Sequence, residues 1–165
     1  MKVYFAADHA GFAQKNELLN FARGELGFEV EDCGAYRDDP ADDYPEIIAS
    51  AARKLAADVA VGLESRAVLL GASGEGEAMV ANRFKGVRCA LYYGYAARAQ
   101  KDLSGNELDI LASTRKHNDA NALSLGARFL TTDEAKEALR IWFATPFSGE
   151  ERHTRRIKQI DEATA

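Results

Sequence analysis

The chain has 165 residues, 47% of them hydrophobic, and a net charge of -5. This length fits one ordinary domain with one filled core, so we expect a single domain over residues 1–165. The acidic charge repels phosphate backbones, which argues against nucleic acid as a partner. No apolar run approaches the roughly 20 residues that span a bilayer, which argues against a membrane partner. Two cysteines and an N-terminus without signal-peptide features predict a reduced, cytoplasmic protein.

Short apolar stretches alternate with segments of helical periodicity along the chain. The predicted strands are 1–7, 28–33, 66–70, 87–92 and a stretch within 123–130. One predicted helix begins after residue 11, a second opens at 42–45 and runs to 60, and a third begins after residue 76. Two more predicted helices cover 132–144 and 150–162. Strands that alternate with helices build parallel sheets, because a parallel neighbour requires a crossover. We therefore predict an α/β fold with a five-stranded doubly wound parallel sheet, a Rossmann-type three-layer sandwich.

Ligands of such folds bind beyond the carboxyl ends of the strands. The loops expected there are 8–11, 71–76 and the segment after the fourth strand. The loop 71–76, with sequence GASGEG, offers backbone N–H groups to an anion, although it lacks the GK[ST] ending of a nucleotide-binding loop. A glycine-rich turn that only permits close packing is the alternative interpretation.

Glu75 and Glu77 follow this turn and are candidates for a general base. Acids in a first helical turn also complement the helix dipole, so an ordinary helix start is the competing interpretation. Three histidines occur without a recognised metal spacing, which predicts a reaction without metal or organic cofactor. Arg152 and Arg156 are four residues apart on one helical face, where they either grip a phosphate or form a solvated basic face.

Seven segments together resemble one family, the type B ribose-5-phosphate isomerases and galactose-6-phosphate isomerases. They are Asp8-His9-Ala10-Gly11, Asp43-Tyr44-Pro45, the loop at 71–76, Ala81-Asn82-Arg83, His117-Asn118-Asp119-Ala120-Asn121, Leu125-Gly126-Ala127-Arg128 and Arg152-His153-x-Arg155-Arg156. Their order and spacing match nearly end to end. The resemblance implies a flavodoxin-like fold and a homodimer, sometimes paired into a tetramer, with active sites shared between subunits. The helix at 150–162 is then expected to pack on a partner subunit.

The resemblance also implies a role for each site residue. His117 would assist opening of the sugar ring. Asp8 and Asn118 would hold sugar hydroxyls, and Tyr44 would line the pocket. The turn at 72–76, with Ser73, Gly74 and Gly76, would stabilise an enediolate. Phosphate would be bound by a set of four side chains: His9, Arg128, Arg152 and Arg156.

The sequence departs from the commonest pattern of this family at two places. Gly71 occupies the position where many members have a cysteine base, and a glycine cannot take a proton. A second branch uses a glutamate just beyond the loop, which assigns the base to Glu77. The segment 93–114, with Ser104-Gly105-Asn106 in its middle, is longer than usual and borders the expected pocket.

We therefore expect an aldose–ketose isomerase that binds a small sugar phosphate. Ribose 5-phosphate is the first choice of substrate. An isomerase of a six-carbon sugar phosphate, such as galactose or allose 6-phosphate, is one alternative. A non-catalytic sugar-phosphate-binding module is the other, in which Glu75 and Glu77 would be ordinary helix-start acids.

Overall fold

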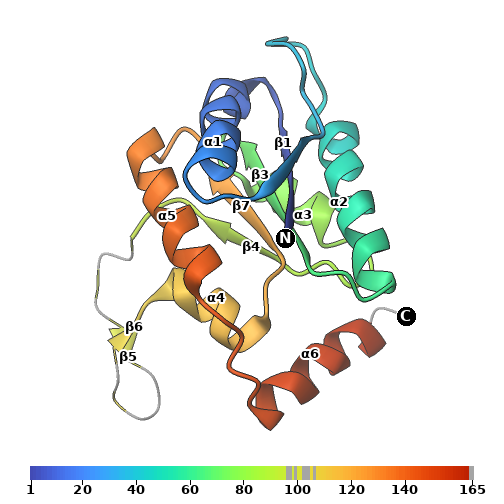
Figure 1. The fold of residues 1–165 in the computed structure, drawn as a ribbon, viewed down its shortest axis with the longest axis vertical. Helices are drawn as coiled ribbons and strands as arrows, with labels where there is room; N and C mark the ends of the chain where they lie inside the picture. The colour runs from blue at the N-terminus through green and yellow to red at the C-terminus, as the bar shows by residue number, and fades with distance from the viewer. Residues whose placement is uncertain (96–97, 99, 102–104, 106, 164–165) are drawn as a thin grey trace.

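A computed structural model of the chain describes residues 1–95, 98, 100–101, 105 and 107–163 (Figure 1). Ser104 and Asn106, in the middle of the segment expected to be long, lie outside the described residues.

Five parallel strands form the central sheet. They are β1 (Lys2–Ala7), β2 (Glu29–Asp32), β3 (Ser65–Gly71), β4 (Cys89–Tyr92) and β7 (Ala122–Gly126). Their order is β2-β1-β3-β7-β4, so the chain first winds outward from β1 to β2 and then turns to the other side at β3. This arrangement confirms the predicted doubly wound sheet and places its switch point between β1 and β3, where such folds bind ligands.

Helices cover both faces of the sheet. They are α1 (Phe12–Gly24), α2 (Tyr44–Ala60), α3 (Glu75–Ala81), α4 (Ile110–Asn118), α5 (Thr132–Ala144) and α6 (Glu151–Ala163), with a 3₁₀ turn η1 (His9–Gly11) after β1. The helices α1, α4 and α5 contribute to the core on one face, and α2 and α3 cover the other.

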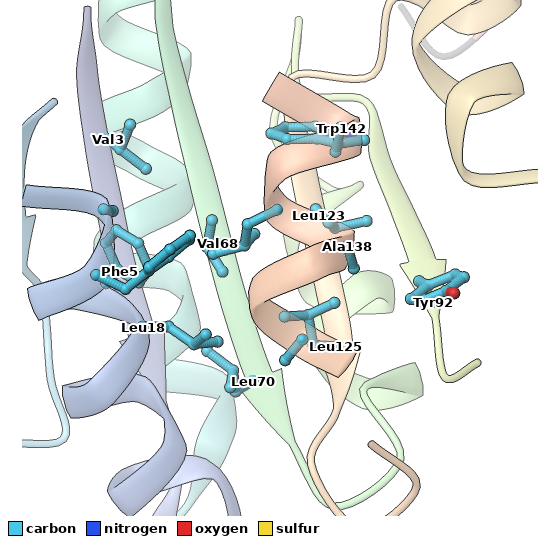
Figure 2. Packing of buried hydrophobic residues seen from close by; sticks show 14 of the residues in the cluster. Val3, Phe5, Leu18, Val68, Leu70, Tyr92, Leu123, Leu125, Ala138 and Trp142 are labelled. Carbon is cyan, nitrogen blue, oxygen red and sulfur yellow. The ribbon is translucent and has the colours of Figure 1, made fainter. Parts of the chain in front are cut away.

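The central strands β1, β3 and β7 are mostly apolar runs because both of their faces are buried, whereas the edge strand β2 carries three acids. On β1, Val3 and Phe5 face α1 and α5, whereas Tyr4 and Ala6 face α2. Figure 2 shows side chains of β1, β3 and β7 in one layer with Ala138 and Trp142 of α5. The central strands are thereby held on two sides, which makes their carboxyl ends a rigid base for a site.

Two elements differ from the sequence-based expectation. The segment around His117, for which no helix was predicted, is the last turn of α4, which Asp109 caps by accepting a hydrogen bond from the Ala112 N–H at 2.7 Å. A short antiparallel pair, β5 (Gln100–Lys101) with β6 (Glu107–Leu108), precedes that helix. Both lie in the long segment after β4, where the apolar periodicity of the sequence is weak.

The C-terminal helix α6 stands at the margin of the molecule and contacts the rest of it chiefly through α4 (Figure 1). His153 is the buried residue of α6, and its other described side chains are exposed or half-buried. Across the described residues, no helix is both long enough and apolar enough to span a bilayer.

Candidate active site

The loop after β1 places a buried carboxylate at the edge of the sheet. Asp8 caps η1 by accepting a hydrogen bond from the Gly11 N–H at 3.2 Å, and only 7% of the residue is exposed. Gly11 lies so close to Leu70 that a Cβ on it would approach the Leu70 Cβ to 2.6 Å. This glycine therefore allows the Asp8 loop to lie directly beside the end of β3.

Hydrogen bonds to the end of β7 fix the loop at 71–76. The Ser124 hydroxyl donates to the Gly74 carbonyl at 2.6 Å, and the Ala127 N–H donates to the Gly71 carbonyl at 2.9 Å. Gly74 has a φ of 79°, which favours glycine, and from there the chain enters α3. The loop is thus a rigid turn whose backbone is set before any ligand binds.

Glu77 is the buried acid of this site. It is 4% exposed, whereas Glu75 points to solvent. Its carboxylate lies against Gly71, where a Cβ would be only 2.0 Å from the Glu77 Oε1. Burial raises the pKa of Glu77, and the charge of nearby Asp8 raises it further, while a hydrogen bond with its own backbone opposes the rise. A carboxylate with a raised pKa is suited to take and return a proton near neutral pH.

Tyr44 belongs to the same site. Its ring lies over Gly76, because a Cβ on Gly76 would come within 2.7 Å of the Tyr44 Cζ. Tyr44 is the first residue of α2, so that helix begins at the mouth of the loop. The structure therefore brings Tyr44 next to the turn that sequence reasoning assigned to the enediolate.

His9 is paired with a carboxylate that the sequence analysis did not single out. The His9 Nδ1 lies 2.7 Å from Asp42 Oδ1, and this hydrogen bond raises the pKa of His9. The nearby positive charge of Arg128 opposes that rise, which places Arg128 at the same edge of the sheet. With its Nδ1 engaged, His9 has its Nε2 left to meet an anion.

Asp8, His9 and Asp42 bring three potential metal ligands within 4.8 Å of one another. Asp42 and His9 are 33 residues apart in the chain, so no sequence spacing signals this cluster. His9 pairs with Asp42 Oδ1, whereas the buried Asp42 Oδ2 has no hydrogen-bond partner among the described residues.

His117 belongs to a second cluster, with α6. Its Nδ1 lies 2.9 Å from the Ser113 Oγ one turn earlier in α4, and its ring lies 4.5 Å from that of His153, centroid to centroid. The His153 Nδ1 in turn lies 3.0 Å from the Ser148 Oγ. Arg152 and Arg156 flank His153 on α6, and both are exposed.

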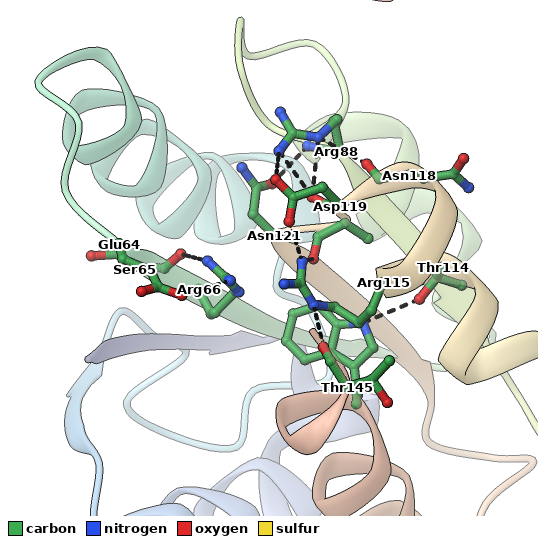
Figure 3. Close-up of polar contacts among 12 residues, drawn as sticks. Glu64, Ser65, Arg66, Arg88, Thr114, Arg115, Asn118, Asp119, Asn121 and Thr145 are labelled. Atoms are coloured by element: carbon green, nitrogen blue, oxygen red, sulfur yellow. Dashed lines mark hydrogen bonds and ion pairs between the residues drawn. The ribbon is translucent and has the colours of Figure 1, made fainter. Parts of the chain in front are cut away.

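A polar network holds the turn that carries His117 and Asn118 (Figure 3). Arg88 donates from Nε to the Asn118 carbonyl at 3.0 Å and forms an ion pair with Asp119 at 2.9 Å. Arg115 reaches the other Asp119 oxygen at 2.7 Å. Asp119 has a φ of 43°, a conformation that few residues adopt outside such a network. Sequence reasoning placed none of these three charged residues in the site, because they support its backbone instead of facing a ligand.

The first cluster, formed by Asp8, His9, Tyr44 and Glu77, and the His117 cluster lie at opposite ends of the strands. Asp8 and Glu77 follow the carboxyl ends of β1 and β3, whereas His117 precedes the amino end of β7. The register pairs Ala67 with Ala122 at one edge and Gly71 with Gly126 at the other. The five strand residues between these two ends span roughly 15 Å. Figure 1 shows α6 on the side away from the carboxyl ends. Within one chain, His117 therefore does not reach Glu77.

A cavity of about 580 Å³ lies near the second cluster. The segment from the end of α3 to the start of β4 lines this cavity and contributes Arg83, Lys85 and Arg88. Asn118 and Ile160 also line it. A shallower hollow runs along the exposed face of α3 beside Met79, which is 63% exposed. The surface between the two clusters is thus hollow and partly apolar.

A buried carboxylate beside a preformed glycine-rich turn, at the switch point of a doubly wound sheet, defines a small-molecule enzyme site for proton transfer. The family model described as Ribose/Galactose Isomerase matches residues 3–160. The chain belongs to this family.

Named relatives cover nearly the whole chain. Ribose-5-phosphate isomerase B of Mycobacterium tuberculosis H37Rv is 36% identical over 162 residues, covering 98% of this chain and 89% of the relative. The Escherichia coli K12 protein of the same name is 30% identical and covers 96% of this chain and 93% of its own length.

Solved structures agree with the fold. Ribose-5-phosphate isomerase B of Mycoplasma genitalium, crystallised with bound ribulose 5-phosphate, superimposes with a TM-score of 0.81 at 28% identity, covering 98% of this chain and 95% of the other. The Thermotoga maritima enzyme gives a TM-score of 0.78 at 33% identity, with 98% and 97% covered. These likenesses confirm the family resemblance and the flavodoxin-like fold that the sequence motifs predicted.

Proposed function

We propose that the protein interconverts ribose 5-phosphate and ribulose 5-phosphate through an enediolate, with Glu77 as the base. The observation that carries this proposal is the buried Glu77 carboxylate in the space beside Gly71. In this position it lies beside the turn at 71–76, whose backbone N–H groups are suited to an oxyanion. The proton that Glu77 takes from C2 of the aldose is returned to C1, so one carboxylate serves both steps.

Ring opening is assigned to the second cluster. His117 donates a proton to the ring oxygen as the bond from C1 to that oxygen breaks, and the C1 hydroxyl gives its proton to the Asp8 carboxylate. Because the His117 Nδ1 is hydrogen-bonded to the Ser113 hydroxyl, the His117 Nε2 is the atom that donates this proton. Asn118 and Asp8 hold sugar hydroxyls, and Tyr44 closes the pocket over Gly76.

Backbone donors stabilise the enediolate. The turn at 72–76 is fixed by Ser124 and the end of β7, so its N–H groups need no rearrangement when charge develops. The Ser73 hydroxyl, which accepts a hydrogen bond from the Glu75 N–H at 3.3 Å, adds a side-chain group at the same place. Gly74 and Gly76 belong to this substrate-binding turn, and their missing side chains make room for Leu91 and for the Tyr44 ring.

Phosphate is bound by groups from both clusters. His9, whose pKa is raised by its hydrogen bond to Asp42, and Arg128 act at the carboxyl edge. Arg152 and Arg156 act from α6, where their exposed guanidinium groups match a phosphate dianion. Phosphate is remote from C1 and C2, so this binding supplies orientation.

These assignments require two chains. His117 and Glu77 lie at opposite edges of one sheet, so a complete pocket combines the Glu77 cluster of one subunit with the His117 cluster of another. In an isologous dimer each subunit then completes its partner's pocket. The marginal position of α6 and the exposed face of α3 support a partner surface between the clusters. We propose a homodimer, alone or paired into a tetramer, in the cytoplasm.

A panel of five- and six-carbon aldose phosphates, assayed for ketose formation in the presence of EDTA, tests this function. We expect ribose 5-phosphate to give the highest kcat/KM and chelation to leave turnover unchanged. Preference for galactose or allose 6-phosphate would move the substrate to the six-carbon class. Absence of turnover with every sugar, although phosphate esters bind, would reject the enzyme in favour of a binding module.

A further inference from the structure

The contact between His117 and His153 is not explained by the roles assigned above. His153 faces inward from α6 and is 4% exposed, although a buried histidine on a short, marginal helix contributes less apolar burial than a leucine would. Its ring meets the His117 ring at 4.5 Å with an interplanar angle of 45°. This contact joins α6 to α4. On α6, His153 lies next to Arg152 and three residues before Arg156.

Both rings are fixed in the same way. Each Nδ1 lies beside a serine hydroxyl, Ser113 for His117 and Ser148 for His153. The Ser148 N–H also donates to the Lys116 carbonyl at 3.1 Å, so the segment before α6 is bound to the last turn of α4. The two rings therefore have one orientation relative to each other, set by hydrogen bonds on either side.

We propose that His153 is a positioning residue that orients His117 for opening of the sugar ring and couples it to the phosphate-binding arginines of α6. This inference rests on the role proposed above for His117. One face of the His117 ring is covered by His153, and its Nδ1 is engaged, so the Nε2 points in a single direction. The same contact sets the distance between His117 and the guanidinium groups on α6.

The surroundings of His153 disfavour its protonated form. Burial lowers the pKa of His153, and the positive charges of His117, Arg152 and Arg156 lower it further against the opposing effect of Glu150. A neutral ring does not repel a protonated His117, whereas a lysine or arginine there would. Phenylalanine would keep the ring contact and lose the hydrogen bond to Ser148.

Ring opening and proton transfer can be measured separately. Ribulose 5-phosphate has an open chain because its C5 hydroxyl carries the phosphate, so exchange of its C1 hydrogen with solvent deuterium requires Glu77 and no ring opening. We therefore expect His153→Ala to lower kcat for ribose 5-phosphate about 10- to 100-fold, the scale of a misplaced catalytic group. Exchange into ribulose 5-phosphate should stay within about threefold of wild type. His153→Phe and Ser148→Ala should give smaller losses of kcat with the same pattern.

Two control variants and two contrary outcomes make the test decisive. Lys158→Ala, on the exposed side of α6, should change neither rate. His117→Ala should lose ribose 5-phosphate turnover and keep the exchange; if it keeps both, the underlying role of His117 fails, whatever His153 does. An unchanged kcat in folded His153→Ala would show that His153 only fills space. A parallel fall of both rates in His153→Phe and Ser148→Ala would show a general disruption of the site and overturn the proposal.

Discussion

The Glu77 carboxylate occupies the space that a side chain on residue 71 would need. A Cβ on Gly71 would lie 2.0 Å from one carboxylate oxygen of Glu77, 2.1 Å from its Cδ and 2.4 Å from the other oxygen. Gly71 has no positive φ, so its backbone would accept another residue. The glycine is therefore required by the base itself and not by the conformation of the chain.

Gly71→Ala should displace the Glu77 carboxylate and lower kcat about 10- to 100-fold, because the base moves relative to the substrate carbons. The fold should survive, since the displaced atoms end a flexible side chain. Gly24→Ala is the matched control, because a Cβ there meets nothing within 4 Å. Steady-state kinetics and circular dichroism check the pair. A Gly71→Ala enzyme with unchanged kcat would place the base elsewhere.

Glu77→Gln should reduce kcat by about 10²- to 10⁴-fold, the scale of a lost general base. Glu75→Gln, at an exposed position, should stay within about threefold of wild type. The reverse ranking would identify Glu75 as the base. Small effects of both would favour the binding module.

The same Glu77→Gln change should stabilise the fold near neutral pH. The folded-state pKa of Glu77 is raised by burial, so its contribution to stability is fully present below the unfolded-state pKa and is lost as pH rises through the folded-state value. Glutamine carries no charge to bury. The Tm of the variant should exceed that of wild type at pH 7, and the difference should shrink toward pH 4. A lower Tm for the variant at pH 7 would contradict this.

The pH dependence of activity follows from the same shift. Only ionised Glu77 takes a proton, so kcat/KM should rise with pH through a limb whose midpoint is above the ordinary glutamate value of about 4.3. Burial supplies the shift. A pH–rate profile for ribose 5-phosphate between pH 4 and 9 measures it. A midpoint at or below the ordinary glutamate pKa would mean that the carboxylate of the base is exposed to solvent.

Asp42→Asn tests the pairing at the phosphate end of the pocket. The hydrogen bond that Asp42 accepts from His9 raises the pKa of His9, so its loss lowers that pKa and His9 becomes neutral at a lower pH. KM for ribose 5-phosphate should then begin to rise at lower pH than in wild type, while kcat at saturation changes little. A KM profile that is identical in both proteins would remove Asp42 from phosphate binding.

Much of the fold was predictable because its sequence signals are local. The apolar runs of β1 and β3, the glycines after them and the helical spacing of α5 each report on their own segment. The residues alone left Glu75 and Glu77 as alternatives, and only the family resemblance assigned the base to Glu77. The burial that distinguishes Glu77 from Glu75 depends on the helix orientation, which the sequence did not determine.

The remaining features depend on contacts between distant segments. The helix α4 was not predicted because Ile110 and Leu111 are followed by polar residues, which leaves little apolar periodicity. Asp42 meets His9 across 33 residues, and His153 meets His117 across 36. The position of His117 at the end of the sheet opposite Glu77 follows from the parallel pairing of β3 with β7, which no single motif contains.

The central claim is that Glu77 of one chain acts with His117 of another, and mixing two inactive variants tests it most directly. Glu77→Gln and His117→Ala proteins are co-refolded in equal amounts, and exchange of chains is confirmed with a mass-tagged subunit. Random pairing makes about half of the dimers mixed, and each mixed dimer has one intact pocket if sites are shared, so about a quarter of wild-type kcat should return. If each pocket used residues of a single chain, no intact pocket would form. A mixture no more active than its parents, with mixed dimers proven, would contradict the account.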